Sequence, residues 1–423
     1  MQQNTAELVP LSGYQKLVIF ILAMTQFTVV LDFMVMSPMG DILMKSMGLT
    51  TSQFGIAVSS YAFSAGLSGL LAAGYADRFD RKKIFLFFYT GFIAGTFLCG
   101  MAGSYPMLIA ARIITGLFGG VIGSISMAII TDIFVLQQRG RVMGFVQMGF
   151  GASQVLGIPV GLFLANSWGW HSAFLWIAGM AVIILVLVSW KLKPINKHLA
   201  LQHDHSAFRH LWNTFSKRQY RIGFGTTALL SIGGFMMMPF GSAFAINNQG
   251  VTEHQLPLLF MISGISALLI MPFIGKLSDK KDKYTIFATA TVGMMLIVLV
   301  YTNLGVIPFW LVVLINILMM AGILGRMTPS TALITAVPEM QDRGAFMSIN
   351  ASLQQLAGGI AAAVAGMIVV QKTKTSPLEH YNFVGYVVAA ISLLAIWMMF
   401  RLSNMIKQRT FKRTRPDLAN PEM

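Results

Sequence analysis

Residues 74–83 read Gly74-Tyr75-Ala76-Asp77-Arg78-Phe79-Asp80-Arg81-Lys82-Lys83, and residues 275–283 read Gly275-Lys276-Leu277-Ser278-Asp279-Lys280-Lys281-Asp282-Lys283. The two segments begin 201 residues apart, and each follows the second of six long apolar runs. A second, shorter repeat is the dipeptide Arg139-Gly140, which recurs as Arg343-Gly344, 204 residues later. A repeat at so constant a spacing predicts a chain built from two similar halves, an architecture that secondary transporters use.

The composition excludes a water-soluble globular protein. Of the 423 residues, 56% are hydrophobic and only 11% are charged, whereas soluble domains carry roughly 25% charged residues. The high apolar content also excludes a disordered chain. The single cysteine, Cys99, excludes an intrachain disulfide and a thiolate metal site.

Twelve apolar runs are long enough to span a bilayer, which takes about 20 apolar residues for roughly 30 Å of hydrocarbon. The runs are continuous rather than alternating, which excludes a β-barrel. The first is too long for a signal-peptide core, so we expect a retained span. The predicted spans are 16–40, 52–74, 83–103, 106–131, 142–164, 173–190, 221–246, 256–275, 284–303, 307–335, 345–370 and 382–402.

The sequence thus predicts an all-α membrane protein with 12 transmembrane helices in two six-helix repeats. The predicted parts are an N-terminal bundle (1–190), a cytoplasmic linker (191–220), a C-terminal bundle (221–402) and a basic cytoplasmic tail (403–423). Of the 30 Lys and Arg, 25 fall on the side of the termini and three, Lys45, Lys372 and Lys374, on the other. This bias predicts that both termini are cytoplasmic. The net charge of +15 is then a topology signal, and no nucleic-acid partner is needed. We expect a multi-pass protein of a bacterial inner (plasma) membrane.

The segment at 74–83 resembles motif A of the major facilitator superfamily at Gly74, Asp77, Arg78, Arg81 and Lys82, while Asp80 stands where a glycine is more usual. Leu108 to Gly116, with Arg112, resembles motif B. Gly149, Gly157, Pro159 and Gly161 resemble motif C of proton-coupled drug exporters, and Leu31-Asp32-Phe33-Met34 also resembles the 12-span drug:proton antiporter group. The resemblance covers the whole chain and implies the major facilitator fold and transport by alternating access.

Asp32 is the one acid well inside a predicted span, and Arg112 lies about six residues into another. A charged carboxylate is costly in a low-dielectric surround. We therefore expect Asp32 to take up a proton in the transport cycle, and the resemblance places Arg112 near that proton site. Two alternatives stay open for Asp32, a permanent pair with an arginine and a cap on a helix broken near Ser37-Pro38. Arg112 could instead extend its side chain to the interface.

Arg326 lies near the middle of the tenth predicted span, beside Pro329, and no intramembrane acid of the second half faces it. It could bind a substrate anion or carbonyl groups freed by the proline. Further polar side chains inside the spans are candidates for the substrate cavity, although each alone is more often an interhelical hydrogen bond. They are Gln26, Tyr61, Gln147, Gln154, Asn316, Asn350 and Gln354.

The motif A residues point to gating rather than to substrate contact. The resemblance implies that Asp77 faces the N-terminus of the eleventh span, and that Arg78 pairs with Asp132 at the end of the fourth. Gly275, Asp279 and Lys280 repeat this segment in the second half. The alternative is that these charges only set the topology. Gly149, Gly157, Pro159 and Gly161 predict close helix packing that also permits movement between the halves.

The sequence therefore predicts a proton-driven exporter of small organic molecules, a drug or metabolite and possibly an anion. The alternative is a proton-coupled uptake symporter for a sugar, amino acid or organic acid. An enzyme is disfavoured because no H-E-x-x-H or G-x-S-x-G motif is present, and a receptor because no segment is long enough for an added soluble domain. We expect no bound cofactor, since no P-loop is present and the proton gradient would supply the energy. The expected partners are the substrate, protons and the lipid bilayer, and we expect a monomer.

Overall fold

The computed structural model describes residues 11–75, 78–196, 199 and 207–414, and this part of the chain is helical apart from one antiparallel bridge between Val370 and Glu379. The first half comprises α1 (Gly13–Val35), α2 (Gly40–Met47), α3 (Thr51–Tyr75), α4 (Arg81–Gly100), α5 (Tyr105–Ile133), α6 (Leu136–Ala152), a π-helical turn (Ser153–Gly157), α7 (Ile158–Trp168) and α8 (His171–Lys191). Then follow α9 (Ala207–Ser216), α10 (Arg221–Phe235), a 3₁₀ turn (Met238–Phe240), α11 (Gly241–Asn247), α12 (Leu256–Lys280), α13 (Lys283–Asn303), α14 (Phe309–Thr335), a 3₁₀ turn (Met340–Asp342), α15 (Arg343–Ile368) and α16 (Tyr381–Thr414).

Twelve segments of the described residues are long and apolar enough to cross a membrane, which confirms the predicted number and the all-α class. They begin and end within a few residues of the predicted spans. The segment 137–168 joins α6, the π-helical turn and α7, and the segment 221–247 joins α10 and α11.

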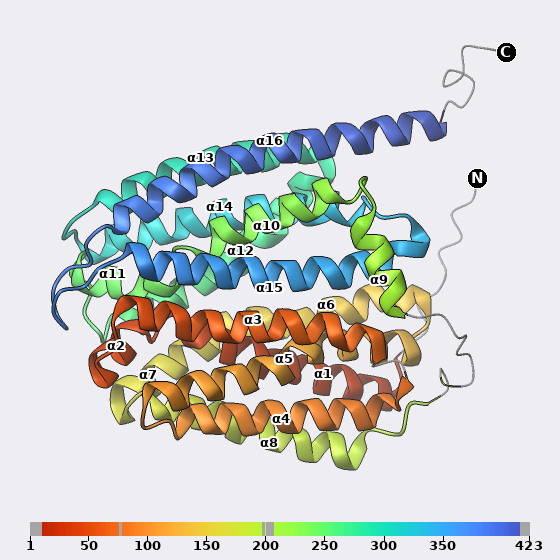
Figure 1. The fold of residues 1–423 in the computed structure, drawn as a ribbon, viewed down its shortest axis with the longest axis horizontal. Helices are drawn as coiled ribbons and strands as arrows, with labels where there is room; N and C mark the ends of the chain where they lie inside the picture. Colours follow the sequence, from red (N-terminus) through yellow and green to blue (C-terminus); the bar gives the residue numbers. More distant parts are fainter. Residues whose placement is uncertain (1–10, 76–77, 197–198, 200–206, 415–423) are drawn as a thin grey trace.

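The helices form two bundles that lie side by side (Figure 1). We call α1–α8 the first half and α10–α16 the second half. Helices α3 and α15 run next to each other along the boundary, whereas α4 and α8 lie at one outer edge of the molecule and α13 and α16 at the other. Both ends of the described chain and α9 lie at the same end of the bundle, which we call the linker end; the opposite end is the far end.

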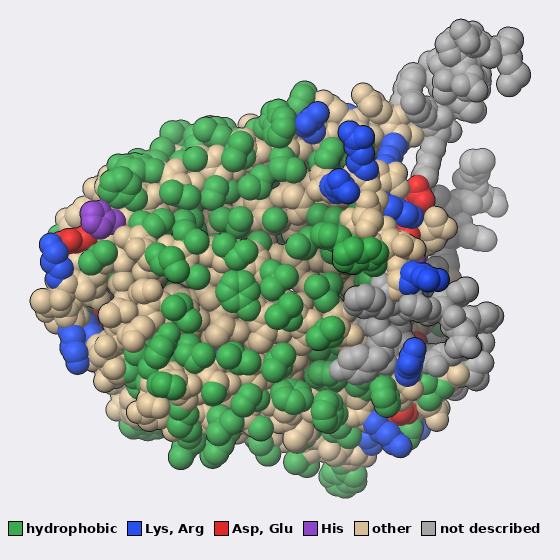
Figure 2. Space-filling view, in the orientation of Figure 1, with side chains coloured by type: hydrophobic (Ala, Val, Ile, Leu, Met, Phe, Trp, Pro, Cys, Tyr) green, Lys and Arg blue, Asp and Glu red, His purple; other side chains and the backbone are tan. Residues whose placement is uncertain are grey.

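Large apolar side chains cover the outside of both halves, as Figure 2 shows for one face. Leu269 and Phe273 on α12 are 73% and 67% exposed, and Ile183 on α8 is 64% exposed. Lys and Arg side chains gather at the two ends, with more of them at the linker end on this face. An apolar band between two charged ends is the surface that a bilayer requires.

The first helix of each half is broken by a proline. Pro38 follows α1 and Pro239 follows α10, and the two prolines are 201 residues apart, the same spacing that separates Gly74 from Gly275. Proline has no backbone N–H and cannot continue the helical hydrogen bonds. The two breaks meet at the far end, where the Ser242 hydroxyl donates a hydrogen bond to the Ser37 carbonyl oxygen at 3.0 Å.

Small residues let α3 and α15 approach closely along their whole length. The Thr51 hydroxyl donates to the Val369 carbonyl at 2.6 Å, and the Ser59 hydroxyl donates to the Gly359 carbonyl at 2.8 Å. A Cβ atom at Gly55 would lie 2.7 Å from the Ala362 carbonyl oxygen, so no larger residue fits there. This contact is the main seam between the halves.

Candidate functional site

Asp32 on α1 and Arg112 on α5 form a fully buried ion pair inside the first half. Nη1 of Arg112 donates to Oδ2 of Asp32 at 2.9 Å and to the Asp32 carbonyl oxygen at 3.3 Å, and both side chains are 0% exposed. Oδ1 of Asp32 accepts a hydrogen bond from the Thr96 hydroxyl on α4 at 3.0 Å. Asp32 is thus paired with an arginine rather than capping the broken helix, and Arg112 points inward rather than to the interface.

The guanidinium group of Arg112 keeps donor capacity beyond this pair. Its Nε and Nη2 atoms are buried and have no hydrogen-bond partner in the described part of the chain. The ring of Tyr61 lies over the guanidinium, 4.6 Å from its carbon atom to the ring centroid, a cation–π geometry. Tyr61 contacts Phe33 at 5.2 Å between centroids, and Phe33 contacts Phe235 on α10 at 5.8 Å. Aromatic contacts therefore join the ion pair to the second half.

Arg326 on α14 is a buried cation of the second half, 214 residues after Arg112 and therefore not at its repeat position. Its side chain is 5% exposed, and Nη1 donates to the Met294 sulfur on α13 at 3.2 Å. No Asp or Glu of the described residues lies within ion-pair distance of it. The expected contact with carbonyl groups near Pro329 is not among its hydrogen bonds.

The other predicted cavity residues differ in burial, and their role in a substrate cavity stays a prediction. Tyr61 is buried, Gln26, Gln154, Asn316 and Asn350 are half-buried, and Gln147 and Gln354 are exposed. Gln154 approaches the Met34 sulfur at 3.8 Å, whereas Asn350 accepts a hydrogen bond from Thr227. Asn316 donates to the Val312 carbonyl of its own helix. Asn350 and Asn316 thus satisfy contacts inside the second half.

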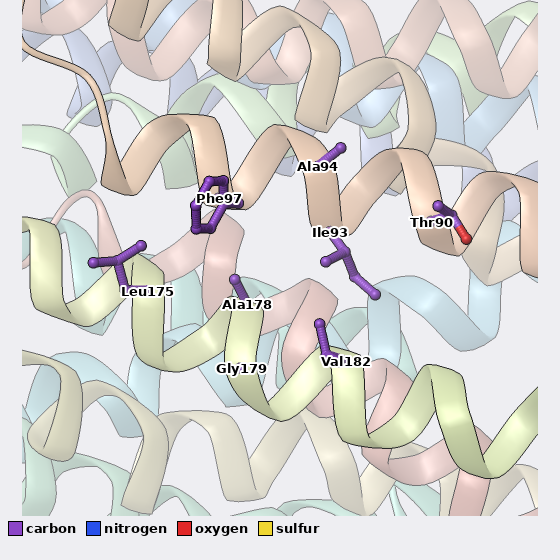
Figure 3. A pocket seen from close by; sticks show the side chains of 8 residues that line it. All are labelled: Thr90, Ile93, Ala94, Phe97, Leu175, Ala178, Gly179 and Val182. Carbon is purple, nitrogen blue, oxygen red and sulfur yellow. The ribbon is translucent and has the colours of Figure 1, made fainter.

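A groove of about 580 Å³ lies between α4 and α8 (Figure 3). Thr90 supplies the polar side chain, and Phe97, Leu175 and Val182 are among the apolar ones. Phe97 and Val182 are 49% and 45% exposed. Because α4 and α8 form an outer edge of the molecule, this groove faces lipid and is not a substrate site.

At the linker end Arg81, not Arg78, pairs with Asp132. Nε of Arg81 lies 3.0 Å from Oδ2 of Asp132, and Arg78 is exposed, so the expected Arg78–Asp132 pair is wrong. The reason is local: α4 begins at Arg81, and its first turn faces the end of α5. Lys82 donates to the Ser189 carbonyl at 2.8 Å. Asp77 lies outside the described residues, so its expected contact with the eleventh span remains a prediction.

Asp80 is the N-cap residue directly before α4, at a position where motif A usually has a glycine. Oδ1 of Asp80 accepts from the Lys83 N–H at 3.0 Å, and Oδ2 accepts from the Ile195 N–H at 2.9 Å. The first bond is an N-cap, which satisfies a helix donor that would otherwise lack a partner. The second fixes the start of the linker. Asp80 therefore stabilises this turn through both of its carboxylate oxygens.

The repeated segment of the second half contains a matching cap. Asp282 accepts from the Thr285 N–H at 3.2 Å, and it pairs with Lys407 on α16 at 2.8 Å. The hydrogen bond from Lys407 holds the pKa of Asp282 below its usual value against the effect of burial, and the Thr285 N–H and the Lys407 charge add to it. Gly275 lies on α12 with open space around it, and Lys280 is exposed. The side chain of Asp279 and the surroundings of Gly74 lie outside the described contacts.

A polar network that the sequence did not suggest joins the halves at the far end. Asp41 on α2 pairs with Lys45 at 2.6 Å and accepts from Asn247 on α11 at 2.6 Å. Lys45 also pairs with Glu253 at 3.4 Å, and Asn166 donates to the Glu253 carbonyl at 3.0 Å. Burial would lower the pKa of Lys45, but the hydrogen bond with Asp41 and the two carboxylate charges raise it above its usual value. These contacts hold the far end closed.

The linker helix α9 is attached to the second half by Asp342. This carboxylate is 2% exposed and binds Lys217 and the Tyr220 hydroxyl, with His210 at 3.8 Å. Burial would raise the pKa of Asp342, but the hydrogen bonds from Lys217 and Tyr220 lower it below its usual value. Asp342 directly precedes Arg343-Gly344, which repeats Arg139-Gly140 of the first half. This repeat was the one feature of the sequence that pointed to the position of Asp342. Helix α9 also contacts α3 and α15.

The glycines of the fifth span line its contact with α1. A Cβ atom at Gly149 would lie 2.2 Å from the Ala23 carbonyl oxygen. A Cβ atom at Gly157 would lie 2.7 Å from a Leu31 methyl group, and one at Gly161 would lie 2.9 Å from a Val35 methyl group. The π-helical turn Ser153–Gly157 lies just before Pro159. The backbone of this span therefore lies directly against the helix that carries Asp32.

Comparisons with known proteins agree with this architecture. An uncharacterized MFS-type transporter, YbcL of Bacillus subtilis (strain 168), is 26% identical over 90% of this chain and 95% of its own. A probable sugar efflux transporter of Helicobacter pylori (strain P12) is 23% identical over 92% and 96%. The crystal structure of a D-xylose–proton symporter superposes with a TM-score of 0.76 at 18% identity, covering 92% of this chain and 98% of that one. The family model of the Major Facilitator Superfamily matches residues 22–362 and 223–421. With twelve membrane-length segments among its described residues, the chain belongs to the Major Facilitator Superfamily and is a membrane transporter, not an enzyme.

Proposed function

We propose that this transporter exports small organic molecules, drugs or metabolites, in exchange for protons, by alternating access between its two halves. The observation that carries the proposal is the fully buried pair of Asp32 and Arg112. An ionisable pair inside a membrane bundle is costly to keep and marks a functional site by default. The likeness to a probable sugar efflux transporter supports the outward direction and makes sugars candidate substrates.

In this proposal, proton uptake by Asp32 breaks the pair. A neutral carboxyl group no longer compensates the charge of Arg112, whose Nε and Nη2 atoms already have no hydrogen-bond partner among the described residues. The guanidinium then moves or takes another acceptor, and Tyr61, which lies over it, moves with it. The contacts from Tyr61 through Phe33 to Phe235 offer a route by which this change reaches the second half.

We further propose that the linker end is cytoplasmic and that the protein lies in the bacterial inner membrane as a monomer. The gathering of Lys and Arg at the linker end supports this orientation. The Arg81–Asp132 pair and the motif A segments would then act at the cytoplasmic gate, and the closed far end would face outward. The proton gradient is the energy source, and no cofactor takes part.

The test uses liposomes that contain a pH dye and carry the purified protein, with glucose, arabinose or ethidium added outside. Antiport predicts that the wild-type interior becomes alkaline as substrate enters. Interior acidification would mean symport and would overturn the export proposal. Asp32→Asn should abolish the proton signal, whereas the control Glu379→Gln, an acid at the far end that pairs with Lys372 within the second half, should keep it. A wild-type signal from Asp32→Asn would assign Asp32 a structural role.

A further inference from the structure

The two buried arginines differ in how their charge is compensated. Arg112 has Asp32 at 2.9 Å, whereas Arg326 donates to the sulfur of Met294, a weak acceptor. Arg326 is nevertheless 5% exposed and lies near the middle of a membrane-crossing helix. A buried charge with no compensation costs several kcal/mol. Within the described residues nothing of the protein's own supplies the missing negative charge.

The repeat aligns Asp32 of the first half with a glycine of the second half. Gly233 on α10 lies 201 residues after Asp32, the spacing that also separates Gly74 from Gly275 and Pro38 from Pro239. The first half thus places a carboxylate at this position, and the second half places a glycine.

The space beside Gly233 adjoins the guanidinium group. A Cβ atom built on Gly233 would lie 3.7 Å from Nη2 of Arg326 and 3.7 Å from a methyl group of Ile391, both ordinary contact distances. A Cβ atom on the next residue, Gly234, would meet nothing within 4 Å. Gly233 therefore places no side chain of its own against the Arg326 guanidinium group, where an Asp would bring a carboxylate next to it.

We propose that this position binds the carboxylate of the transported substrate. A planar guanidinium group fits a carboxylate with two parallel hydrogen bonds. Because Asp32 already neutralises Arg112, one positive charge remains, which suits a monoanion. Met294 and Ile391 supply apolar contact beside the charge. This assignment rests on the proposed function in that the bound anion is the cargo, and it makes that cargo an organic acid.

The test measures binding to the purified full-length protein in detergent by its thermal unfolding. The probes are benzoate and gluconate, each compared with its neutral counterpart, benzamide and glucose, and with chloride. We expect the two carboxylates to raise the unfolding temperature of the wild type, and the neutral compounds and chloride at equal concentration to leave it unchanged. Equal stabilisation by the neutral compounds, or no stabilisation by either carboxylate, would overturn the proposal. Equal stabilisation by chloride would make this a halide site and overturn it as well.

Variants locate the effect. Arg326→Gln should weaken the apparent affinity for the carboxylate roughly tenfold or more. Gly233→Asp should supply an internal carboxylate and remove the response while leaving Arg326 in place, which covers the case that Arg326→Gln does not fold. Gly233→Asn, of nearly the same size but neutral, should retain more of the response than Gly233→Asp. An unchanged response in Arg326→Gln, or equal loss in the two Gly233 variants, would refute the assignment.

The binding measurements are made without a proton gradient and do not depend on the direction of transport, so they test the anion site separately from the export proposal. Carboxylate binding that depends on Arg326, together with acidification of the liposomes, would keep the anion site and reject export. Alkalinisation with neutral substrates and no carboxylate binding would keep export and reject the anion site.

Discussion

Asp80 and Asp282 occupy matching positions in the two halves. Each is the residue before a membrane-crossing helix, and each carboxylate accepts a hydrogen bond from the backbone N–H three residues later. They differ in their second contact, which is the Ile195 N–H for Asp80 and the Lys407 ammonium group for Asp282. The same type of N-cap thus occurs in both halves. Asp80 uses its second contact to hold the linker, and Asp282 uses its second contact to hold the last helix, α16.

Replacing Asp80 should loosen both α4 and the linker. We expect Asp80→Ala to lower the free energy of unfolding by about 1 kcal/mol, the usual cost of a lost N-cap, and to speed amide exchange at Lys83 and Ile195. Asp80→Asn keeps a capping oxygen and should behave closer to the wild type. Thermal unfolding and hydrogen exchange measure the two effects. Unchanged exchange at Ile195 in Asp80→Ala would show that the linker is held by other contacts.

Replacing one partner of the buried ion pair should lower the free energy of unfolding more than replacing both partners. Arg112→Gln leaves Asp32 buried without its counter-charge, so we expect a loss of about 3–5 kcal/mol in unfolding free energy. The double variant Asp32→Asn/Arg112→Gln should lose less. A double-mutant cycle by thermal unfolding in detergent gives the coupling energy. Additive effects of the two single substitutions would mean that the pair does not act as a unit.

The contact between the fifth span and α1 leaves no room for a methyl group at Gly149. Gly149→Ala would place Cβ 2.2 Å from the Ala23 carbonyl oxygen, and backbone atoms cannot give way cheaply. We expect a loss of about 1–3 kcal/mol in unfolding free energy. Gly144→Ala on the same helix is the matched control, because a Cβ there meets nothing within 4 Å. The control should be neutral or slightly stabilising; equal destabilisation of both would contradict the packing argument.

The far-end network should set how much of the protein is open at that end. Lys45→Met removes the ion pairs with Asp41 and Glu253, and the Asn247 contact of Asp41 still joins the halves there. An ion pair of this exposure contributes about 0.5–1 kcal/mol, so we expect the far-end-open population to rise about two- to fivefold. Spin labels at Ser46→Cys and His254→Cys, one on each half, report the distance, and native Cys99 is buried. Lys372→Met, which breaks a pair within the second half, should leave the distribution unchanged.

The attachment of α9 should survive mild acid and fail in strong acid. Because the folded pKa of Asp342 lies below its usual value of about 3.9, its contribution to stability is complete above that value and is lost as the pH falls through the lowered one. We expect amide exchange of Ala207–Ser216 to be constant from pH 7 to about 5, after correction for intrinsic rates, and to accelerate below about 4. Asp342→Asn should remove this step. A step well above the usual range of a carboxyl group would contradict the assignment to Asp342.

Much of the fold could be predicted because the bilayer imposes one simple rule. Each span must be a long apolar helix, so hydropathy alone located all twelve. The breaks at Pro38 and Pro239 also follow from the sequence, since the spacing of the repeat aligns them.

Contacts between distant residues were harder to predict. Asp32 and Arg112 both stood out as intramembrane charges, and the resemblance to motif B placed Arg112 near the proton site. The direct pair between them, however, depends on how α1 packs against α5, which composition and periodicity do not encode. Arg78 and Arg81 lie in one basic segment, and only the start of α4 at Arg81 decides which of them meets Asp132. The far-end network could not be predicted because Asp41, Lys45 and Glu253 lie in short helices and loops with no repeated motif.

The meeting of the two proline breaks has a consequence for how the far end can open. Ser37 of one half meets Ser242 of the other, and a Cβ at Gly40 would touch the Pro239 carbonyl oxygen at 3.0 Å. The spacing of 201 residues between Pro38 and Pro239 gives the two breaks the same place in their halves. Opening the far end therefore has to separate two matching breaks, each in the first membrane-crossing segment of its half.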